Sequence, residues 1–199
     1  MPVAFSEQER THIAEALRST GRRLFSTVGL KKTSLAELAA GAGIVKSTFY
    51  TFFDSKEALY LDLLLEHAQR VREATITNGL RQGRDTVDSL RHYLRAVVQV
   101  LNDDPLYRRL LSHPDEMVLL QRKLTPEVVA AAGNNGMAEL TEFIAAKQST
   151  GEIIGNDPVV VVGALRSVLL LVMHADEFGD TYPQVLDLAI DALTAGVTS

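Results

Sequence analysis

One short stretch, residues 34–56, constrains the fold of this chain more than any other part of the sequence. It reads SLAELAAGAGIVKSTFYTFFDSK, two runs with helical spacing on either side of a glycine-rich interruption. In the first run, apolar or small side chains recur every three or four residues, at Leu35, Leu38, Ala39 and Ala42. Gly43 stands where a sharp turn needs a positive φ, and Ala39 leaves room for two helices to cross. The stretch therefore predicts two short helices joined by a tight turn.

The second of these helices has a polar face without acidic residues. Phe49 and either Phe52 or Phe53 form its apolar side. The outward side chains are then Lys46, Ser47, Thr48, Tyr50 and Thr51. One cation, one phenol and several hydroxyls suit a polyanion and the floor of a DNA major groove. An ordinary helical hairpin with a polar outer surface is the alternative, but few such hairpins exclude acidic residues from a whole exposed face.

At these residues the chain resembles the helix-turn-helix of the tetracycline-repressor (TetR) family of bacterial transcription regulators. The resemblance extends back through GLKKT, residues 29–33, and forward through the exit of the motif, residues 49–59. One position departs from the family pattern, because Val45 stands where the family usually carries a small polar residue, often Ser. A valine side chain cannot cap a helix. We therefore expect water or backbone groups to cap the start of the second helix.

The resemblance implies a ligand-responsive regulator, which we expect to be a repressor that binds double-stranded operator DNA as a homodimer. A small-molecule effector, largely apolar, would release it from the DNA. Tyr50 and Lys56 are expected to contact phosphates, and Lys46 either a phosphate or a guanine. The full set of expected DNA-binding residues is Thr33, Ser34, Lys46, Ser47, Thr48, Tyr50, Thr51 and Lys56.

The distribution of charge agrees with a DNA-binding N-terminal region. Residues 1–56 contain eight Lys and Arg against five Asp and Glu, a balance of +3. The remaining residues contain twelve against twenty, a balance of −8, so that the whole chain carries −5. An acidic remainder would keep DNA away from the rest of the molecule. Cysteine is absent, which excludes disulfides and thiolate metal sites, and no secretory signal pattern opens the chain, so we expect a cytoplasmic protein.

The rest of the chain predicts an all-α protein with about nine helices and no strand. A helical stripe over residues 7–28 has Ser6 as its expected N-cap and Gly29 as its terminator. Further caps are expected at Thr33 or Ser34, with Glu37 completing a capping box, and at Asp54 or Ser55. Later helices are expected over 55–74, 86–101, 105–113, 115–123, 127–150, 158–178 and from 182 onward, with loops at 75–83 and 151–156.

We expect two domains, a helix-turn-helix DNA-binding domain at residues 1–56 and a helical effector-binding and dimerisation domain at residues 57–199. The glycines and asparagines of residues 133–136 predict a kink or break, since each glycine costs about 1 kcal/mol in a helix interior. Four side chains are candidates for lining an effector cavity, although each is also an ordinary core residue type. They are His67, Tyr93, Met117 and Met173.

The last two helices are apolar on more than one face, which predicts that they pair with those of a second copy. The expected interface residues are Val162, Arg166, Leu170, Leu186, Ala189 and Leu193. A membrane span over residues 158–175 is disfavoured because Arg166 and Ser167 interrupt its centre.

Two other classes of protein compete with a DNA-binding regulator. The first is a helical ligand- or protein-binding module that does not read DNA, which the acidic overall charge and Val45 favour. The second is an all-helical enzyme, for which the sequence offers no cysteine nucleophile, phosphate-binding glycine loop or nucleophile elbow. His174 and Glu177 have the spacing of two metal ligands, but a capping or solvated role is expected at a helix end. We expect neither a cofactor nor a metal.

Overall fold

The computed structural model describes residues 5–121, 125 and 136–198. These residues form helices joined by turns, with no strand among them and one isolated bridge between Ile153 and Thr198. The all-α fold expected from the sequence is therefore confirmed. Within the same residues, no helix is both long enough and apolar enough to cross a bilayer.

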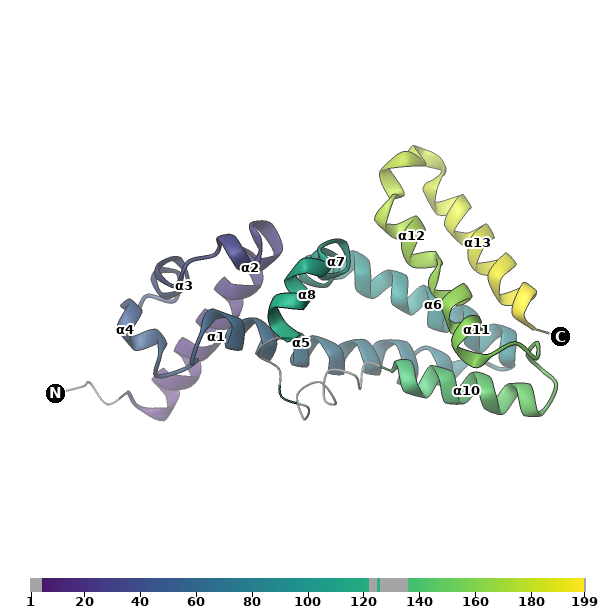
Figure 1. The fold of residues 1–199 in the computed structure, drawn as a ribbon, viewed down its shortest axis with the longest axis horizontal. Helices are drawn as coiled ribbons and strands as arrows, with labels where there is room; N and C mark the ends of the chain where they lie inside the picture. Colours follow the sequence, from purple (N-terminus) through teal and green to yellow (C-terminus); the bar gives the residue numbers. More distant parts are fainter. Residues whose placement is uncertain (1–4, 122–124, 126–135, 199) are drawn as a thin grey trace. The chain divides into compact units, whose positions relative to one another are not determined.

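By its internal contacts the chain divides into two units (Figure 1). The first unit comprises residues 1–67 and 105–128. Its helices are α1 (Glu7–Thr27), α2 (Gly29–Lys32), α3 (Leu35–Gly41), α4 (Lys46–Phe49), the first part of α5 (Lys56–Arg72), α7 (Pro105–Ser112) and α8 (Pro114–Gln121). Helix α5 begins in this unit and ends in the second.

The second unit comprises residues 68–104 and 129–199. It contains the end of α5 and the helices α6 (Thr86–Asp103), α10 (Met137–Ser149), α11 (Pro158–Arg166), α12 (Val168–Met173) and α13 (Tyr182–Val197). Single turns of other helical types complete it: a π-turn at Glu73–Thr77 and 3₁₀ turns at Leu80–Gln82, Ala175–Glu177 and Gly179–Thr181.

The helix starts expected in the N-terminal region are confirmed by their caps. Ser6 and Ser34 each accept a hydrogen bond from the backbone N–H three residues later. The carboxylates of Glu9 and Glu37 accept hydrogen bonds from the backbone N–H groups of the two serines, which completes two capping boxes. Helix α5 is capped by Ser55, whose hydroxyl accepts from the N–H of Ala58 at 3.1 Å. These local signals act within one turn, which is why the sequence could identify them.

Other boundaries differ from the expected ones. The single helix expected over residues 158–178 is two helices, because the chain breaks at Ser167, whose hydroxyl donates to the Ala164 carbonyl at 2.7 Å. The loop expected from residue 75 starts later, since the π-turn continues α5 to Thr77. The expected break at 133–136 lies outside the described residues except for Gly136, which has a φ of 85° immediately before α10.

A buried apolar cluster holds the first unit together. Its fully buried members come from α1, α2, α3, α4, α5, α7 and α8, and include Leu17, Phe25, Leu30, Leu38, Phe49, Leu59, Tyr60, Leu63, Leu106 and Leu120. The edge of the Tyr60 ring meets Phe25 with the ring centroids 4.9 Å apart. Helices α7 and α8 are thus part of the same packed body as the helix-turn-helix, although they are about fifty residues beyond it in the chain.

A buried carboxylate joins α8 to the turn between α1 and α2. Glu116, with its side chain 4% exposed, accepts hydrogen bonds from the Arg109 guanidinium at 3.0 and 3.2 Å. The hydroxyl of Tyr60 donates to the second oxygen of Glu116 at 3.3 Å. Gly29, with a φ of 84°, passes so close that an added Cβ would meet both Arg109 and Glu116. A buried charge needs such partners, so this arrangement orders the α1–α2 turn.

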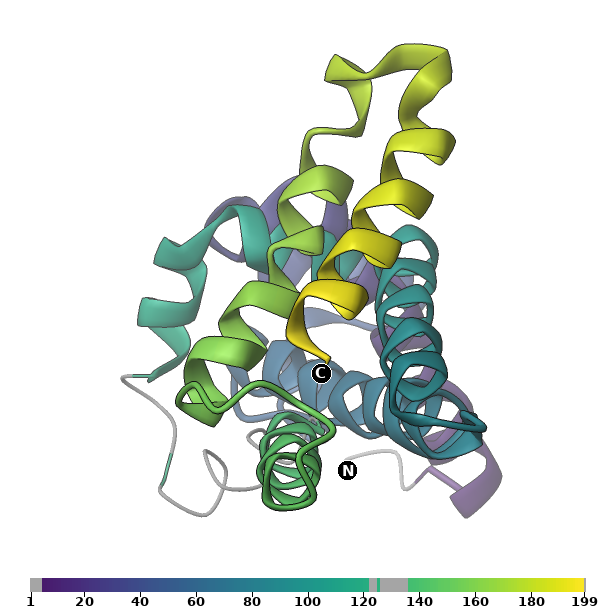
Figure 2. The same cartoon turned by 90° about the vertical axis from the view of Figure 1, so that its right-hand side faces the viewer.

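In the second unit, the last helices pack side by side. Helix α13 (yellow) runs beside α11 and α12 (light green) in both views (Figures 1 and 2). Helix α13 also packs against α6, where Arg91 lies 2.8 Å from Asp191 and Arg95 lies 3.5 Å from Asp187. These ion pairs are partly exposed and therefore add little to stability, so the buried apolar side chains beneath them carry the packing.

Replacing Gly29 by alanine should cost much more stability than replacing Gly43. Both glycines have a positive φ, 84° and 69°, so alanine at either position is strained by about 1–2 kcal/mol. At Gly29 the new methyl group also collides with Arg109 and Glu116, whereas at Gly43 it meets nothing within 4 Å. We expect urea unfolding to give about 2–5 kcal/mol for Gly29→Ala once overpacking is included. Equal losses for the two variants would show that the Glu116 contact does not constrain this turn.

Candidate DNA-binding surface

The turn between α3 and α4 has the geometry that the sequence predicted. Gly43 adopts a left-handed φ of 69°, which confirms its expected role. The backbone N–H of Ile44 donates to the Ala39 carbonyl at 3.0 Å, and Ala39 is buried where α3 and α4 pack together. A larger side chain at Ala39 would separate the two helices. The turn therefore sets the direction in which α4 leaves α3.

Helix α4 is held by its phenylalanines. Phe49 is fully buried, and its ring centroid lies 6.0 Å from that of Phe53. Phe52 is half-buried under Phe5, at 6.2 Å between centroids, with the Arg10 guanidinium 5.4 Å above its ring. The inward position expected for these rings is confirmed. Burying one side of so short a helix leaves the other side to the solvent.

That outer side carries most of the residues expected to read DNA. Lys46, Ser47, Tyr50 and Thr51 are exposed, and Thr48 is half-buried. The hydroxyl of Thr51 donates to the Thr48 carbonyl, which uses its proton within the helix turn. Val45 precedes the helix and provides no side-chain cap, as expected. The surface thus offers one ammonium group, two hydroxyls and a phenol, with no carboxylate among residues 45–53.

Two of the expected DNA-binding residues are occupied inside the protein. Thr33 is buried, and its hydroxyl donates to the Gly29 carbonyl at 2.8 Å, so its side chain offers no group to DNA. The hydroxyl of Ser34 donates to the Glu37 carboxylate at 2.7 Å and accepts from the Glu37 N–H at 3.2 Å. Both residues therefore stabilise the α2–α3 junction. The sequence predicted only that Thr33 or Ser34 caps the helix that follows.

Lys56 is bound to the backbone at the same junction. Its ammonium group donates to the carbonyls of Leu30 at 2.7 Å, Lys31 at 3.2 Å and Thr33 at 2.7 Å. These carbonyls lie at the C-terminal end of α2, where a cation is favoured. An ammonium group has three protons, and all three have acceptors here. The geometry gives Lys56 a structural role, while the phosphate contact expected from the sequence stays a prediction.

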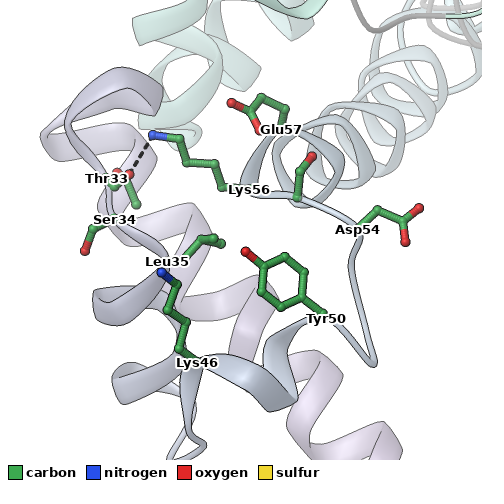
Figure 3. Close-up of a pocket in the computed structure, with 9 residues that line it drawn as sticks. Thr33, Ser34, Leu35, Lys46, Tyr50, Asp54, Lys56 and Glu57 are labelled. Carbon is green, nitrogen blue, oxygen red and sulfur yellow. Dashed lines mark hydrogen bonds between the residues drawn. The ribbon is translucent and has the colours of Figure 1, made fainter.

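A pocket of about 370 Å³ opens between the α2–α3 junction, α4 and the start of α5. Lys46, Tyr50 and Lys56 line it, together with Thr33, Ser34, Leu35, Asp54, Ser55 and Glu57. Figure 3 shows the Tyr50 hydroxyl and the Lys46 ammonium both directed toward Leu35, whereas the Asp54 carboxylate points away from Lys46. Lys46 and Tyr50 therefore form a donor side of the pocket, from which the Asp54 carboxylate is directed away.

The residues expected to line an effector cavity belong to different units or have side chains outside the described part. His67 is buried in the first unit with its ring 4.4 Å from that of Tyr107, and Tyr93 is buried in the second unit. Met173 is exposed at the end of α12, and the side chain of Met117 lies outside the described part. The effector site expected from the sequence therefore stays a prediction.

The residues expected in a dimer interface differ in exposure. Leu170 is 61% exposed, whereas Val162 is buried within its own unit and so offers no surface to a partner. Arg166, Leu186, Ala189 and Leu193 are half-buried. Val159, Val160 and Leu188 are also well exposed on α11 and α13. Helical periodicity could not separate these positions from the buried ones, because both helices are apolar on several faces.

His174 and Glu177 lie on the surface, with the imidazole Nδ1 2.8 Å from a carboxylate oxygen. No group of three or more potential metal ligands occurs in the part of the chain that the structure describes. The exposed position of both side chains agrees with the solvated role that is one of the two roles we expected, and their contact was not expected.

Replacing Lys56 by methionine should destabilise the fold, because the apolar stem stays and only the ammonium group is lost. Hydrogen bonds to a charged group contribute about 1.5–3 kcal/mol net, and we expect a loss of this size in urea unfolding. Lys46→Met is the matched control, since the Lys46 side chain is exposed, and it should leave stability unchanged. An unchanged stability of Lys56→Met, together with a flatter salt dependence of DNA binding, would favour the phosphate contact instead.

Comparison with known proteins agrees with this geometry. Residues 17–63 match the family described as bacterial regulatory proteins, tetR family. The uncharacterized HTH-type transcriptional regulator YdgC of Bacillus subtilis is 34% identical over 83 residues, which cover 40% of this chain and 43% of that protein. The chain thus aligns with less than half the length of this relative.

Solved structures extend the likeness of fold to nearly the whole chain. A TetR family transcription regulator from Marinobacter aquaeolei VT8 has a TM-score of 0.76 at 20% identity, covering 98% of this chain and 100% of that one. AibR, solved in complex with isovaleryl coenzyme A and operator DNA, has a TM-score of 0.69 at 19% identity, covering 89% and 96%. Motif, geometry and fold agree: residues 17–63 match the tetR family of bacterial regulatory proteins, and nearly the whole chain has the fold of a TetR family transcription regulator.

Proposed function

We propose that this protein is a ligand-responsive transcription repressor that binds operator DNA as a homodimer. The observation that carries the proposal is the outer surface of α4, which presents Lys46, Ser47 and Tyr50 without a carboxylate. The match of residues 17–63 to the tetR family supports DNA binding, and the positive charge balance of residues 1–56 supports DNA binding at the same end of the chain. Because operator DNA is the partner, the proposal also places the protein in the cytoplasm.

In this proposal α4 enters the major groove, and the donor side of the pocket holds a backbone phosphate. Lys46 and Tyr50 are directed to the same side of that pocket, so together they suit one phosphate oxygen pair (Figure 3). This choice assigns Lys46 to the backbone rather than to guanine. Ser47, Thr48 and Thr51 then face base edges, although Thr48 and Thr51 share an internal hydrogen bond.

In this proposal the two domains expected from the sequence have different functions. Residues 1–56 bind DNA, and residues 57–199 bind the effector and form the dimer. Helix α5 runs without interruption from Lys56 to Arg72, so the two activities share one helix. AibR combines a small molecule and operator DNA in one protein of this fold, which supports an effector for this chain as well. An effector lowers DNA affinity only through its different affinity for the two arrangements of the protein.

The proposed dimer forms through α11, α12 and α13. Val159, Val160, Leu170 and Leu188 are exposed on these adjacent helices, and exposed apolar side chains that gather on one surface mark an interaction site. Pairing two copies would cover them in a four-helix arrangement. A dimer is also what a two-fold symmetric operator requires, since each copy reads one half-site.

DNA binding is tested by a salt titration on a duplex selected by this protein from a random pool, against a scrambled duplex. Lys46→Ala should weaken binding to both duplexes and reduce the slope of log affinity against log salt by about one. Tyr50→Phe should weaken both duplexes without changing that slope, because only a neutral donor is lost. Arg84→Ala, in the second unit and paired with Asp88, should change neither quantity. A protein that selects no duplex at low salt would contradict the proposal.

The dimer is tested by placing a charge on the exposed face of α13. Leu188 is 72% exposed, so Leu188→Glu should leave each copy folded while a buried glutamate opposes pairing. Sedimentation at micromolar concentration should give a dimer for the unmodified chain and a monomer for the variant, with unchanged circular dichroism. Val118→Glu is the control, because Val118 is also exposed but lies on α8. A dimeric Leu188→Glu protein would place the interface elsewhere.

A further inference from the structure

Val45 is a well exposed apolar residue on the proposed DNA-binding surface. Its side chain is 68% exposed, while its neighbour Ile44 packs against the buried cluster of the first unit. Exposing the apolar surface of a valine side chain to water is unfavourable in free energy. Val45 lies beside the polar residues Lys46 and Ser47 on the proposed DNA-binding surface. An apolar group of a bound partner that covers Val45 would therefore contribute favourably to binding.

The backbone holds Val45 in a defined orientation. Its φ and ψ are −82° and 154°, and its carbonyl accepts from the Thr48 N–H at 2.9 Å, which ties it to the first turn of α4. Val45 also has few rotamers, because a β-branched side chain is stiff at χ1. The two methyl groups thus project from the same rigid element that carries Lys46 and Tyr50.

DNA offers one apolar group in the major groove, the 5-methyl group of thymine. A serine at this position, the usual residue in the family pattern, can bond to several base edges. Valine has no donor or acceptor, so against a polar base edge it would remove water without replacing the lost hydrogen bond. We propose that Val45 is a specificity-determining residue that reads the 5-methyl group of one thymine in each operator half-site.

This inference rests on the proposed DNA binding and deepens it by assigning a base. It predicts one thymine in each half-site whose replacement by uracil lowers the affinity for DNA, although the two bases have identical hydrogen-bonding edges. Deleting the methyl group from the base, or both methyl groups from the residue, should remove the same contact. The two deletions should therefore not add, which distinguishes a direct contact from two independent effects.

The experiment uses the full-length protein and a duplex that it selects from a random pool. Each thymine is replaced in turn by deoxyuridine, symmetrically in both half-sites, and affinity is measured for the unmodified chain and for Val45→Ala. We expect one position at which uracil costs the unmodified chain about three- to tenfold per half-site, the value of one buried methyl group. Val45→Ala should bind the thymine duplex as weakly as the unmodified chain binds the uracil duplex, and should not distinguish the two.

Two controls keep the result specific. Val45→Ala should unfold at the same temperature as the unmodified chain, since the side chain is exposed and provides no cap. Thymines at other positions should respond to uracil equally in both proteins. If the unmodified chain selects a sequence but its response to uracil is the same after Val45→Ala at every position, the assignment of Val45 is wrong while DNA binding stands. If no duplex is selected, both the assignment and the proposed function are overturned.

Discussion

The DNA-binding surface of this protein depends on the burial of Phe49. In a helix as short as α4, one fully buried ring determines the rotation of the whole element about its axis. With Phe49 inward, Lys46, Ser47 and Tyr50 are outward, and a rotation by a third of a turn would bury one of them instead. The outer residues are therefore free to vary with the DNA sequence, while the inner one is not.

The cluster that receives Phe49 is larger than the helix-turn-helix itself. Residues of α7 contribute to it, and α8 adds Glu116, whose buried carboxylate is bound by Arg109 and Tyr60 next to Gly29. A buried carboxylate without these partners would be strongly unfavourable, so the three groups constrain one another. The N-terminal helices are thus supported by a segment about fifty residues further along the chain.

The α2–α3 junction is held by a second charge. Lys56 directs its ammonium group to three carbonyls, and Ser34 caps α3 beside them. A lysine at the entry of α5 can bind backbone carbonyls or phosphates with the same chemistry, and only its surroundings decide between the two. Here the carbonyls surround Lys56, whereas the side chains of Lys46 and Tyr50 are directed into the pocket beside Leu35 (Figure 3).

The sequence alone was sufficient for the fold class, for both capping boxes, for the left-handed Gly43 and for the inward phenylalanines. These features arise from interactions within one or two helical turns, so a local pattern contains the information. The boundaries at Thr77 and Ser167, the burial of Thr33 and Val162, and the carbonyl contacts of Lys56 came only from the tertiary structure. For Lys56 the bonded carbonyls lie 23 to 26 residues away in the chain, and for Val162 several faces of the helix are equally apolar, so that only packing could decide. At Thr33 and Ser167 the hydroxyl bonds a nearby carbonyl, but a serine or threonine has several such local choices and the folded backbone selects one.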